Sequence, residues 1–206
     1  MIKSSSFDQK AANWDTAEKL SRSEAVANFV LDRFELQDHL SVIDLGCGTG
    51  QLSFLLTRTA KSLIGVDNSK GMLEVFDQKI QQLGIKNAKS KLVDMEQGLK
   101  GLPKADLIVS EMTMHHIPNI DNFLASCFAL TEPEGALIIA DLDAEDGSFH
   151  DDNAGVYHQG FSAEYMREAF EKAGYTDVDT EKVFVIKKET DQGRKVYNIL
   201  ATIGFR

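Results

Sequence analysis

Residues 42–52, Val-Ile-Asp-Leu-Gly-Cys-Gly-Thr-Gly-Gln-Leu, constrain the fold of this chain more than any other stretch. An apolar run ends at Asp44, and Gly46, Gly48 and Gly50 then alternate with two small side chains. The pattern predicts a buried strand, a sharp turn and a helix, because glycine accepts a positive φ and lets a ligand approach the backbone closely. The first N–H groups of such a helix favour polar or anionic ligand groups. We therefore expect a ligand-binding turn here.

Polar residues also follow the next apolar runs. Residues 63–67 read as a second strand that ends in Asp67, 17 residues after Gly50. A carboxylate at that place can hold the hydroxyl groups of a ribose. Runs at 89–93 and 105–110 read as third and fourth strands, which end at Asp94 and Ser110. Alternating strand and helix patterns predict a doubly wound α/β sandwich, in which these strand ends meet at one edge.

These motifs, in this order, resemble those of the class I S-adenosylmethionine-dependent methyltransferases. The Gly-x-Gly-x-Gly spacing differs from the Gly-x-Gly-x-x-Gly of dinucleotide-binding proteins. The resemblance implies a Rossmann-like seven-stranded sheet, mostly parallel, whose last strand is antiparallel and inserted between strands five and six. It also implies a single methyltransferase domain over residues 1–206, with residues 1–36 as an N-terminal helical lid segment.

The resemblance further implies S-adenosylmethionine as cofactor and a set of residues around it. Asn68 and Met72 match positions that flank the adenine, and Met95 matches the position that stacks on it. Met72 could equally be a core residue, and the candidate lid residues Phe7 and Trp14 could equally be edge packing. The implied cofactor-binding residues are Asp44, Gly46, Cys47, Gly48, Gly50, Asp67, Asn68, Met72, Asp94, Met95 and Ser110.

The charge distribution limits the methyl acceptor. The net charge is −10, and residues 105–166 contain twelve carboxylates but no Lys or Arg. Such a surface repels a polyanion, although a solvated acidic face explains many of these carboxylates equally well. The Asn/Asp-Pro-Pro-aromatic tetrad of many nucleic-acid and protein amide methyltransferases is absent, since Ser110-Glu111-Met112-Thr113 stands in its place. We expect a small neutral or cationic acceptor and no nucleic-acid partner.

Methyl transfer from a sulfonium depends mainly on alignment, and a base is needed only if the acceptor arrives protonated. The candidates for catalytic residues are His116, His115 and His158. His116 matches the last residue of a metal-binding Glu-x-x-Glu-His pattern in some methyltransferases, but His115 and Met112 replace its carboxylates. This disfavours Mg²⁺, and Zn²⁺ would suit the site better, but we expect no metal. The candidate substrate-binding residues are Trp14, Glu111, Asp141, Asp143 and His150.

The remaining expectations concern boundaries, location and alternative functions. Ser21 or Ser23 can cap the N-terminal helix, residues 141–160 form a polar loop, and residues 182–187 and 196–203 form the last two strands. No apolar run approaches the ~20 residues that span a bilayer, the N-terminus lacks the apolar core of a signal peptide, and the two cysteines suggest no disulfide framework. We expect a cytoplasmic protein without a membrane partner. An NAD-dependent Rossmann oxidoreductase and a non-catalytic S-adenosylmethionine-binding regulatory subunit stay open as alternatives.

Overall fold

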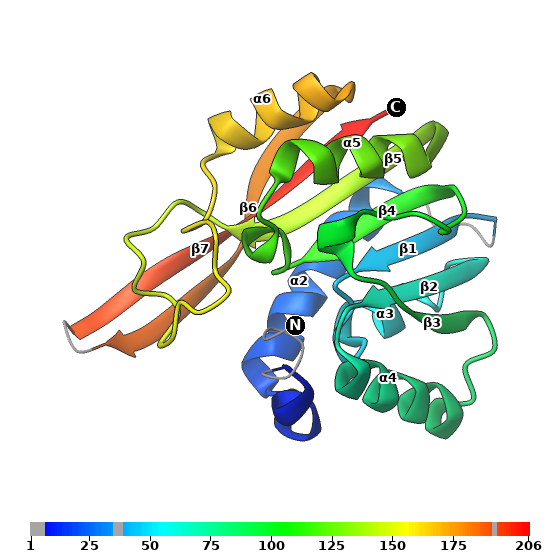
Figure 1. Cartoon of the computed structure of the whole chain (residues 1–206), viewed down its shortest axis with the longest axis horizontal. Coiled ribbons are helices and arrows are strands. Elements are labelled where there is room, and N and C mark those ends of the chain that lie inside the picture. Colours follow the sequence, from blue (N-terminus) through cyan, green and yellow to red (C-terminus); the bar gives the residue numbers. More distant parts are fainter. Residues whose placement is uncertain (1–6, 35–38, 191–192) are drawn as a thin grey trace.

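A seven-stranded sheet forms the centre of the computed structural model, which describes residues 7–34, 39–190 and 193–206 (Figure 1). The strands lie in the order β3-β2-β1-β4-β5-β7-β6. Strand β7 runs antiparallel to both of its neighbours, β5 and β6, and the other described strands run parallel to one another. The predicted mostly parallel sheet with an inserted antiparallel strand is therefore confirmed. The strands are β1 (Ser41–Leu45), β2 (Ser62–Asp67), β3 (Ala88–Leu92), β4 (Ala105–Glu111), β5 (Thr131–Leu142), β6 (Thr176–Thr190) and β7 (Gly193–Phe205).

Helices cover both faces of this sheet. Side chains of α2, α3 and α4 share one hydrophobic cluster, and side chains of α5 and α6 share a second. Strand β1 shows how the sequence builds two clusters, because Val42 belongs to the first and Ile43 to the second, as period-two alternation requires. The helices are η1 (Ala11–Asn13), α2 (Ala17–Arg33), α3 (Gln51–Leu56), α4 (Lys70–Leu83), η2 (Met95–Gln97), η3 (Met114–His116), α5 (Ile120–Leu130) and α6 (Ala163–Ala173).

The capping signals in the sequence correctly mark both ends of α4, but they mark the wrong start for α2. Helix α4 begins after Ser69, whose side chain accepts a hydrogen bond from Met72 N, and it ends at Gly84 in the left-handed conformation. Helix α2, however, is capped by Thr16, so the prediction of Ser21 or Ser23 was wrong. Both serines lie inside α2, because the good helix formers that follow Thr16 extend it towards the N-terminus.

The C-terminal strands are longer than predicted, since β6 and β7 pair from Thr176 and Phe205 out to Thr190 and Gly193. The residues added at the hairpin end, 188–190 and 193–195, are polar or glycine, so no apolar alternation marks them in the sequence. Between β5 and α6, residues 143–162 form turns and bends. The polar loop predicted over residues 141–160 therefore begins two residues later than expected, because Asp141 and Leu142 still belong to β5. In the part of the chain that the structure describes, no helix has both the length and the apolarity needed to cross a membrane.

Candidate functional site

The glycine turn between β1 and α3 has the geometry that its sequence predicts. Gly46, Gly48 and Gly50 have φ values of 78°, 52° and 89°. A Cβ placed on Gly46 would lie 2.0 Å from Thr113 Oγ1, so any side chain there would collide with the segment after β4. The backbone N–H of Gly48 donates to Asp67 Oδ2 at 2.9 Å, which joins the turn to the end of β2. The expected turn therefore forms where β1, β2 and β4 end.

Two carboxylates lie at this edge in different environments. Asp44 is buried and accepts a hydrogen bond from Ser53 Oγ at 2.5 Å, and burial raises the pKa of Asp44 to about 7. Asp67 is 8% exposed and accepts from both Gly48 N and Ser69 N. Burial also raises the pKa of Asp67. A carboxylate has about four acceptor positions, so Asp67 retains capacity to accept hydrogen bonds from ribose hydroxyls.

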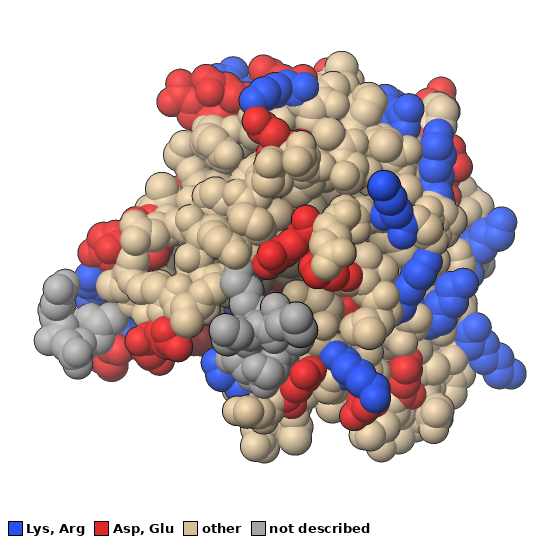
Figure 2. All heavy atoms as spheres, viewed as in Figure 1, with Lys and Arg blue, Asp and Glu red and all other residues tan. Residues whose placement is uncertain are grey.

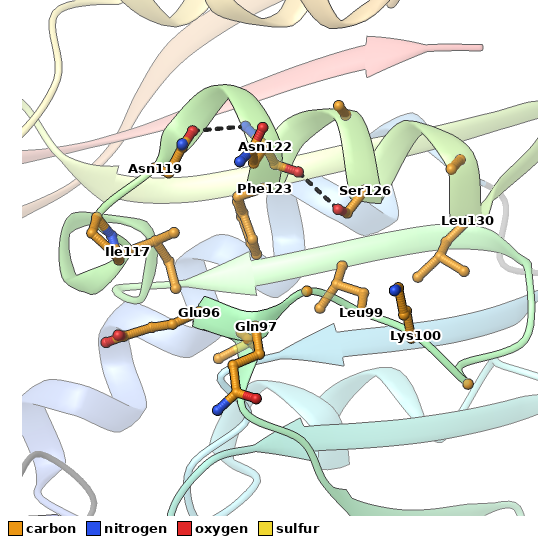
Figure 3. A pocket seen from close by; sticks show the side chains of 16 residues that line it. Glu96, Gln97, Leu99, Lys100, Ile117, Asn119, Asn122, Phe123, Ser126 and Leu130 are labelled. Carbon is orange, nitrogen blue, oxygen red and sulfur yellow. Dashed lines mark hydrogen bonds between the residues drawn. The ribbon is translucent and has the colours of Figure 1, made fainter. Parts of the chain in front are cut away.

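The predicted adenine end lies after β3. Asp94 is exposed and caps η2, accepting from Glu96 N at 3.1 Å. Met95 is buried and lines a cavity of about 540 Å³ between η2 and α5, where Leu99 and Phe123 lie on opposite sides (Figure 3). No glycine-turn residue lines this cavity. The cavity therefore adjoins the predicted adenine end and does not contain the whole predicted cofactor site.

Three predicted cofactor residues have side chains that are occupied by packing. Ser110 is buried and its Oγ donates to Leu45 O at 2.8 Å. Cys47 packs in the first hydrophobic cluster, and burial raises the pKa of its thiol well above the usual value. Met72 is also buried, whereas Asn68 is half-buried. The cofactor roles of these residues stay predictions, and for Ser110 and Cys47 the backbone is the more accessible part.

Two aromatic side chains from the N-terminal segment lie over the glycine turn. Trp14 Nε1 is 3.6 Å from the position that a Cβ on Gly48 would occupy. The Phe7 ring packs edge-on against Trp14, with centroids 5.8 Å apart, and against His116, with centroids 5.5 Å apart. These contacts connect the glycine turn to the segment after β4. Phe7 and Trp14 thus lie over the predicted site, whereas α2 packs against the sheet, and the role of residues 1–36 as a lid stays a prediction.

Two aspartates that were not among the predicted site residues hold this segment in place. Asp8 accepts from Ser69 Oγ at 2.6 Å and from Gly71 N at 2.8 Å, and these two hydrogen bonds lower the pKa of Asp8. Asp15 accepts from Thr49 Oγ1 at 2.5 Å. Their partners lie 34 to 63 residues away in sequence, so no local pattern could have identified them.

Glu111, a predicted substrate-binding residue, is engaged by helix α2. One carboxylate oxygen accepts from Arg22 Nε at 2.6 Å and the other from Ser23 Oγ at 2.7 Å. The side chains of Arg22 and Glu111 are only 11% and 8% exposed. This contact fixes α2 against the end of β4, and the substrate role of Glu111 stays a prediction.

Three histidines meet beside this edge. The ring centroids of His115 and His116 are 4.1 Å apart, and those of His115 and His150 are 5.0 Å apart. His115 Nδ1 lies 2.6 Å from Asp141 Oδ1, and both side chains are almost fully buried. Burial favours the protonated form of Asp141, but its contacts with His115 and its hydrogen bond from Leu142 N together lower the pKa of Asp141. Burial lowers the pKa of His150 to about 4, so its ring is neutral at pH 7.

The loop after β5 brings His150 to the other two histidines. Tyr157 N donates to His115 O at 3.0 Å, and His116 Nδ1 lies 2.9 Å from Gly155 O. His158 instead directs Nε2 to Ile117 O at 2.9 Å, and it lies outside the three-histidine group. Asp143 accepts from Asn198 Nδ2, which fixes the start of the loop on β7. The structure therefore separates His158 and Asp143 from the group formed by His115, His116, His150 and Asp141.

A family model described as "Methyltransferase domain" matches residues 36–203. The chain belongs to this family. The prediction of a class I S-adenosylmethionine-dependent methyltransferase is confirmed at the level of the family, with S-adenosylmethionine as its cofactor. The family membership also sets aside the dinucleotide-dependent oxidoreductase considered from the sequence.

Individual relatives of this methyltransferase are distant. An uncharacterized methyltransferase of Schizosaccharomyces pombe is 26% identical over 165 residues, which cover 72% of this chain and 58% of that protein. Ubiquinone biosynthesis O-methyltransferase of Coxiella burnetii is 27% identical over 133 residues, which cover 63% and 56%. The chain thus spans a little over half the length of these curated relatives.

A solved structure extends the likeness to the whole fold. The methyltransferase bound to the Trm112 activator in a Haloferax volcanii complex matches with a TM-score of 0.77, covering 97% of this chain and 96% of that one. Its sequence identity is 18%, so this likeness concerns the fold alone.

Proposed function

We propose that this methyltransferase transfers the methyl group of S-adenosylmethionine to a small neutral or cationic molecule. The observation that carries the proposal is the position of the buried His115–Asp141 pair beside His116, the residue that Phe7 and Trp14 connect to the glycine turn. This arrangement supports a cofactor site and an acceptor site that adjoin each other under the N-terminal segment. The proposal assumes that residues 1–206 act as a single domain.

The residues present fit the cofactor. The glycine turn offers a backbone without side chains, and Asp67 retains acceptor capacity for ribose hydroxyls. Asp94 and Met95 would lie at the adenine, with the cavity beside Met95 as added space. The cofactor supplies a methyl group already activated on a positively charged sulfur, so the protein's task is to hold acceptor and donor in line and to exclude water.

Proton removal from the acceptor falls to the histidine group. In His115 the bond from Nδ1 to Asp141 fixes the tautomer and leaves the lone pair on Nε2, the arrangement that orients a general base. His158 is a second candidate, although its Nε2 faces a carbonyl oxygen. The acceptor atom can be oxygen, nitrogen or sulfur, and the name of the Coxiella burnetii relative makes oxygen the first choice.

Charge supports a small neutral or cationic acceptor. In Figure 2 the Lys and Arg side chains gather towards the side where β2 and β3 lie, and the centre of the face carries Asp and Glu. Residues 105–166, which include the histidine group, contain no Lys or Arg. A nucleic acid would meet repulsion there. A cytoplasmic location is also proposed, because both cysteines are buried and unpaired, as is usual in a reducing compartment.

Two measurements test the proposal. Calorimetry should show binding of S-adenosylmethionine and of its demethylated product, and no binding of NAD. Incubation with methyl-labelled S-adenosylmethionine and a metabolite extract should then transfer label to a small molecule. Binding without any transfer across extracts from several sources would favour the non-catalytic regulatory subunit, and absence of cofactor binding would refute the proposed site.

A further inference from the structure

Three histidine side chains from two distant segments are placed as potential ligands of one ion. His115 and His116 lie in η3, and His150 lies in the long loop between β5 and α6, drawn in yellow in Figure 1. One ring nitrogen from each residue lies within 4.8 Å of those of the other two. Nitrogens bound tetrahedrally to Zn²⁺ at ~2.0–2.1 Å are roughly 3.3 Å apart, so a small inward rotation of the rings would complete the geometry.

The hydrogen bonds of the rings orient their lone pairs. His115 Nδ1 faces Asp141 Oδ1 and His116 Nδ1 faces Gly155 O, so each Nδ1 carries the proton. A ring that donates through Nδ1 binds a metal through the lone pair of Nε2. His115 Nε2 and His150 Nε2 are buried, and among the described residues neither has a hydrogen-bond partner. Buried polar atoms are normally paired, so two orphaned nitrogens in one small group call for a ligand.

We propose that His115, His116 and His150 bind one divalent transition-metal ion, with Zn²⁺ as the first candidate. Three neutral imidazoles suit Zn²⁺, Ni²⁺ or Co²⁺ and suit Mg²⁺ poorly, because Mg²⁺ requires oxygen ligands. Three protein ligands also leave a fourth position open, as in catalytic zinc sites. This assignment differs from the expectation of no metal that the sequence alone produced.

Asp141 acts as a positioning residue for the proposed metal site. Metal-binding histidines usually donate their second ring N–H to a carboxylate or a carbonyl oxygen, which fixes the ring and raises the basicity of the ligand nitrogen. Asp141 performs this role for His115, and it also accepts from His115 N and Leu142 N, which hold the carboxylate in place. Gly155 O performs it for His116.

The charges around the group favour a cation. Residues 105–166 contribute twelve carboxylates and no Lys or Arg. Lys188 contacts the residues on either side of His150, where its ammonium group donates to Phe149 O and Asp151 Oδ1. His116 and His150 are half-buried, so they form the more exposed side of the group. The Phe7 ring against His116 places that side beneath the N-terminal segment.

The role of the ion rests on the proposed function, whereas its binding does not. With an ion bound, His115 Nε2 is a metal ligand and no longer the general base, so the ion would replace the base. It would lower the pKa of an acceptor hydroxyl next to it, and the proton would leave to water at neutral pH. The acceptor oxygen then forms a bond to the methyl carbon. The carbon–sulfur bond breaks, and its electron pair returns to sulfur, which becomes a neutral thioether.

The test measures metal binding directly on the full chain without a polyhistidine tag. After treatment with a chelator, the protein is titrated with Co²⁺, whose absorption spectrum reports tetrahedral coordination, and the bound Co²⁺ is displaced with Zn²⁺. One ion per chain is expected. The variants His116→Gln and His150→Gln should weaken binding at least tenfold, and Asp141→Asn by 10–100-fold. The control His39→Gln changes an exposed histidine remote in sequence and should bind as the wild type does.

A wild-type chain that binds no stoichiometric ion, or a His150→Gln variant that binds as tightly as the wild type, would overturn the proposal. His150 is half-buried, so this variant remains informative if a change at buried His115 prevents folding. Calorimetry with S-adenosylmethionine on the same metal-free protein reports separately on the proposed function. Failure of cofactor binding with intact ion binding would refute the function and leave the metal site.

Discussion

Substitution of Gly71 by Ala isolates the role of the N-terminal segment. A Cβ on Gly71 would lie 2.8 Å from Asp8 Cα and 3.0 Å from Asp8 O, and both are backbone atoms that cannot rotate away. Residues 7–15 must therefore shift off the start of α4. The helix itself should not suffer, because alanine is favoured over glycine in helices by up to ~1 kcal/mol.

The magnitude follows from the hydrogen bonds that the shift would break. Asp8 accepts from Gly71 N and Ser69 Oγ, and each such bond contributes ~0.5–1.5 kcal/mol net. Asp8 is exposed, so a total of about 1–2 kcal/mol is reasonable, which corresponds to a roughly 5–30-fold larger population of the open segment. The melting temperature should change little, since these contacts lie at the edge of the domain.

Trypsin cleavage after Lys10, an exposed residue of this segment, measures the opening. Cleavage tracks the open population when opening is fast, so Gly71→Ala should be cut roughly 5–30 times faster than the wild type. Glu74→Ala, an exposed change on the same helix, is the matched control and should be cut at the wild-type rate. S-adenosylmethionine should slow cleavage of the wild type. Equal cleavage rates of Gly71→Ala and the wild type would refute the idea that contacts with the start of α4 hold the segment closed. If the cofactor does not change the cleavage rate, Phe7 and Trp14 serve in packing and not in a lid.

Three further substitutions test the site. Asp67→Ala should weaken S-adenosylmethionine binding by ~1.5–3 kcal/mol in calorimetry, and unchanged affinity would show that the ribose lies elsewhere. The pKa of Asp44 is raised to about 7, so its stabilising effect is complete below pH ~4 and is lost as the pH rises to 7. In urea unfolding, Asp44→Asn should therefore reduce the fall in stability between these pH values. Glu111→Gln should lower the free energy of unfolding by ~1–3 kcal/mol because it leaves Arg22 without its charge partner, whereas Glu24→Gln, an exposed change on α2, should not.

Local sequence patterns were sufficient for most of the fold. The glycine turn, the capping of α4 by Ser69 and the strand alternation seen at Val42 and Ile43 all depend on residues within a few positions of one another. The antiparallel position of β7 came from the family resemblance, and the sheet confirms it. The cap of α2 was missed because Thr16, Ser21 and Ser23 are all chemically suitable, and local chemistry alone does not choose among them.

The site was harder to predict, because its contacts join segments that are remote in sequence. His115 and Asp141 were each candidates from the sequence, but their pairing across 26 residues was not predicted. The engagement of Glu111 by α2 spans 88 and 89 residues, and nothing local marks Arg22 or Ser23 as its partners. The sequence therefore produced a set of candidate side chains, and the fold determined which of them meet.

The position of β7 has a consequence for the folding of the chain. Strand β5 pairs with β7 from Ala136↔Phe205 to Leu142↔Ile199, although some 60 residues separate the partners. During synthesis β5 therefore emerges long before its neighbour, and until residues 193–205 arrive one edge of an apolar strand has no partner. Unpaired strand edges of this kind promote aggregation, and contacts between remote segments slow folding. Closure of the sheet by β7 is then expected to be the late step that determines how long the nascent protein remains vulnerable to aggregation.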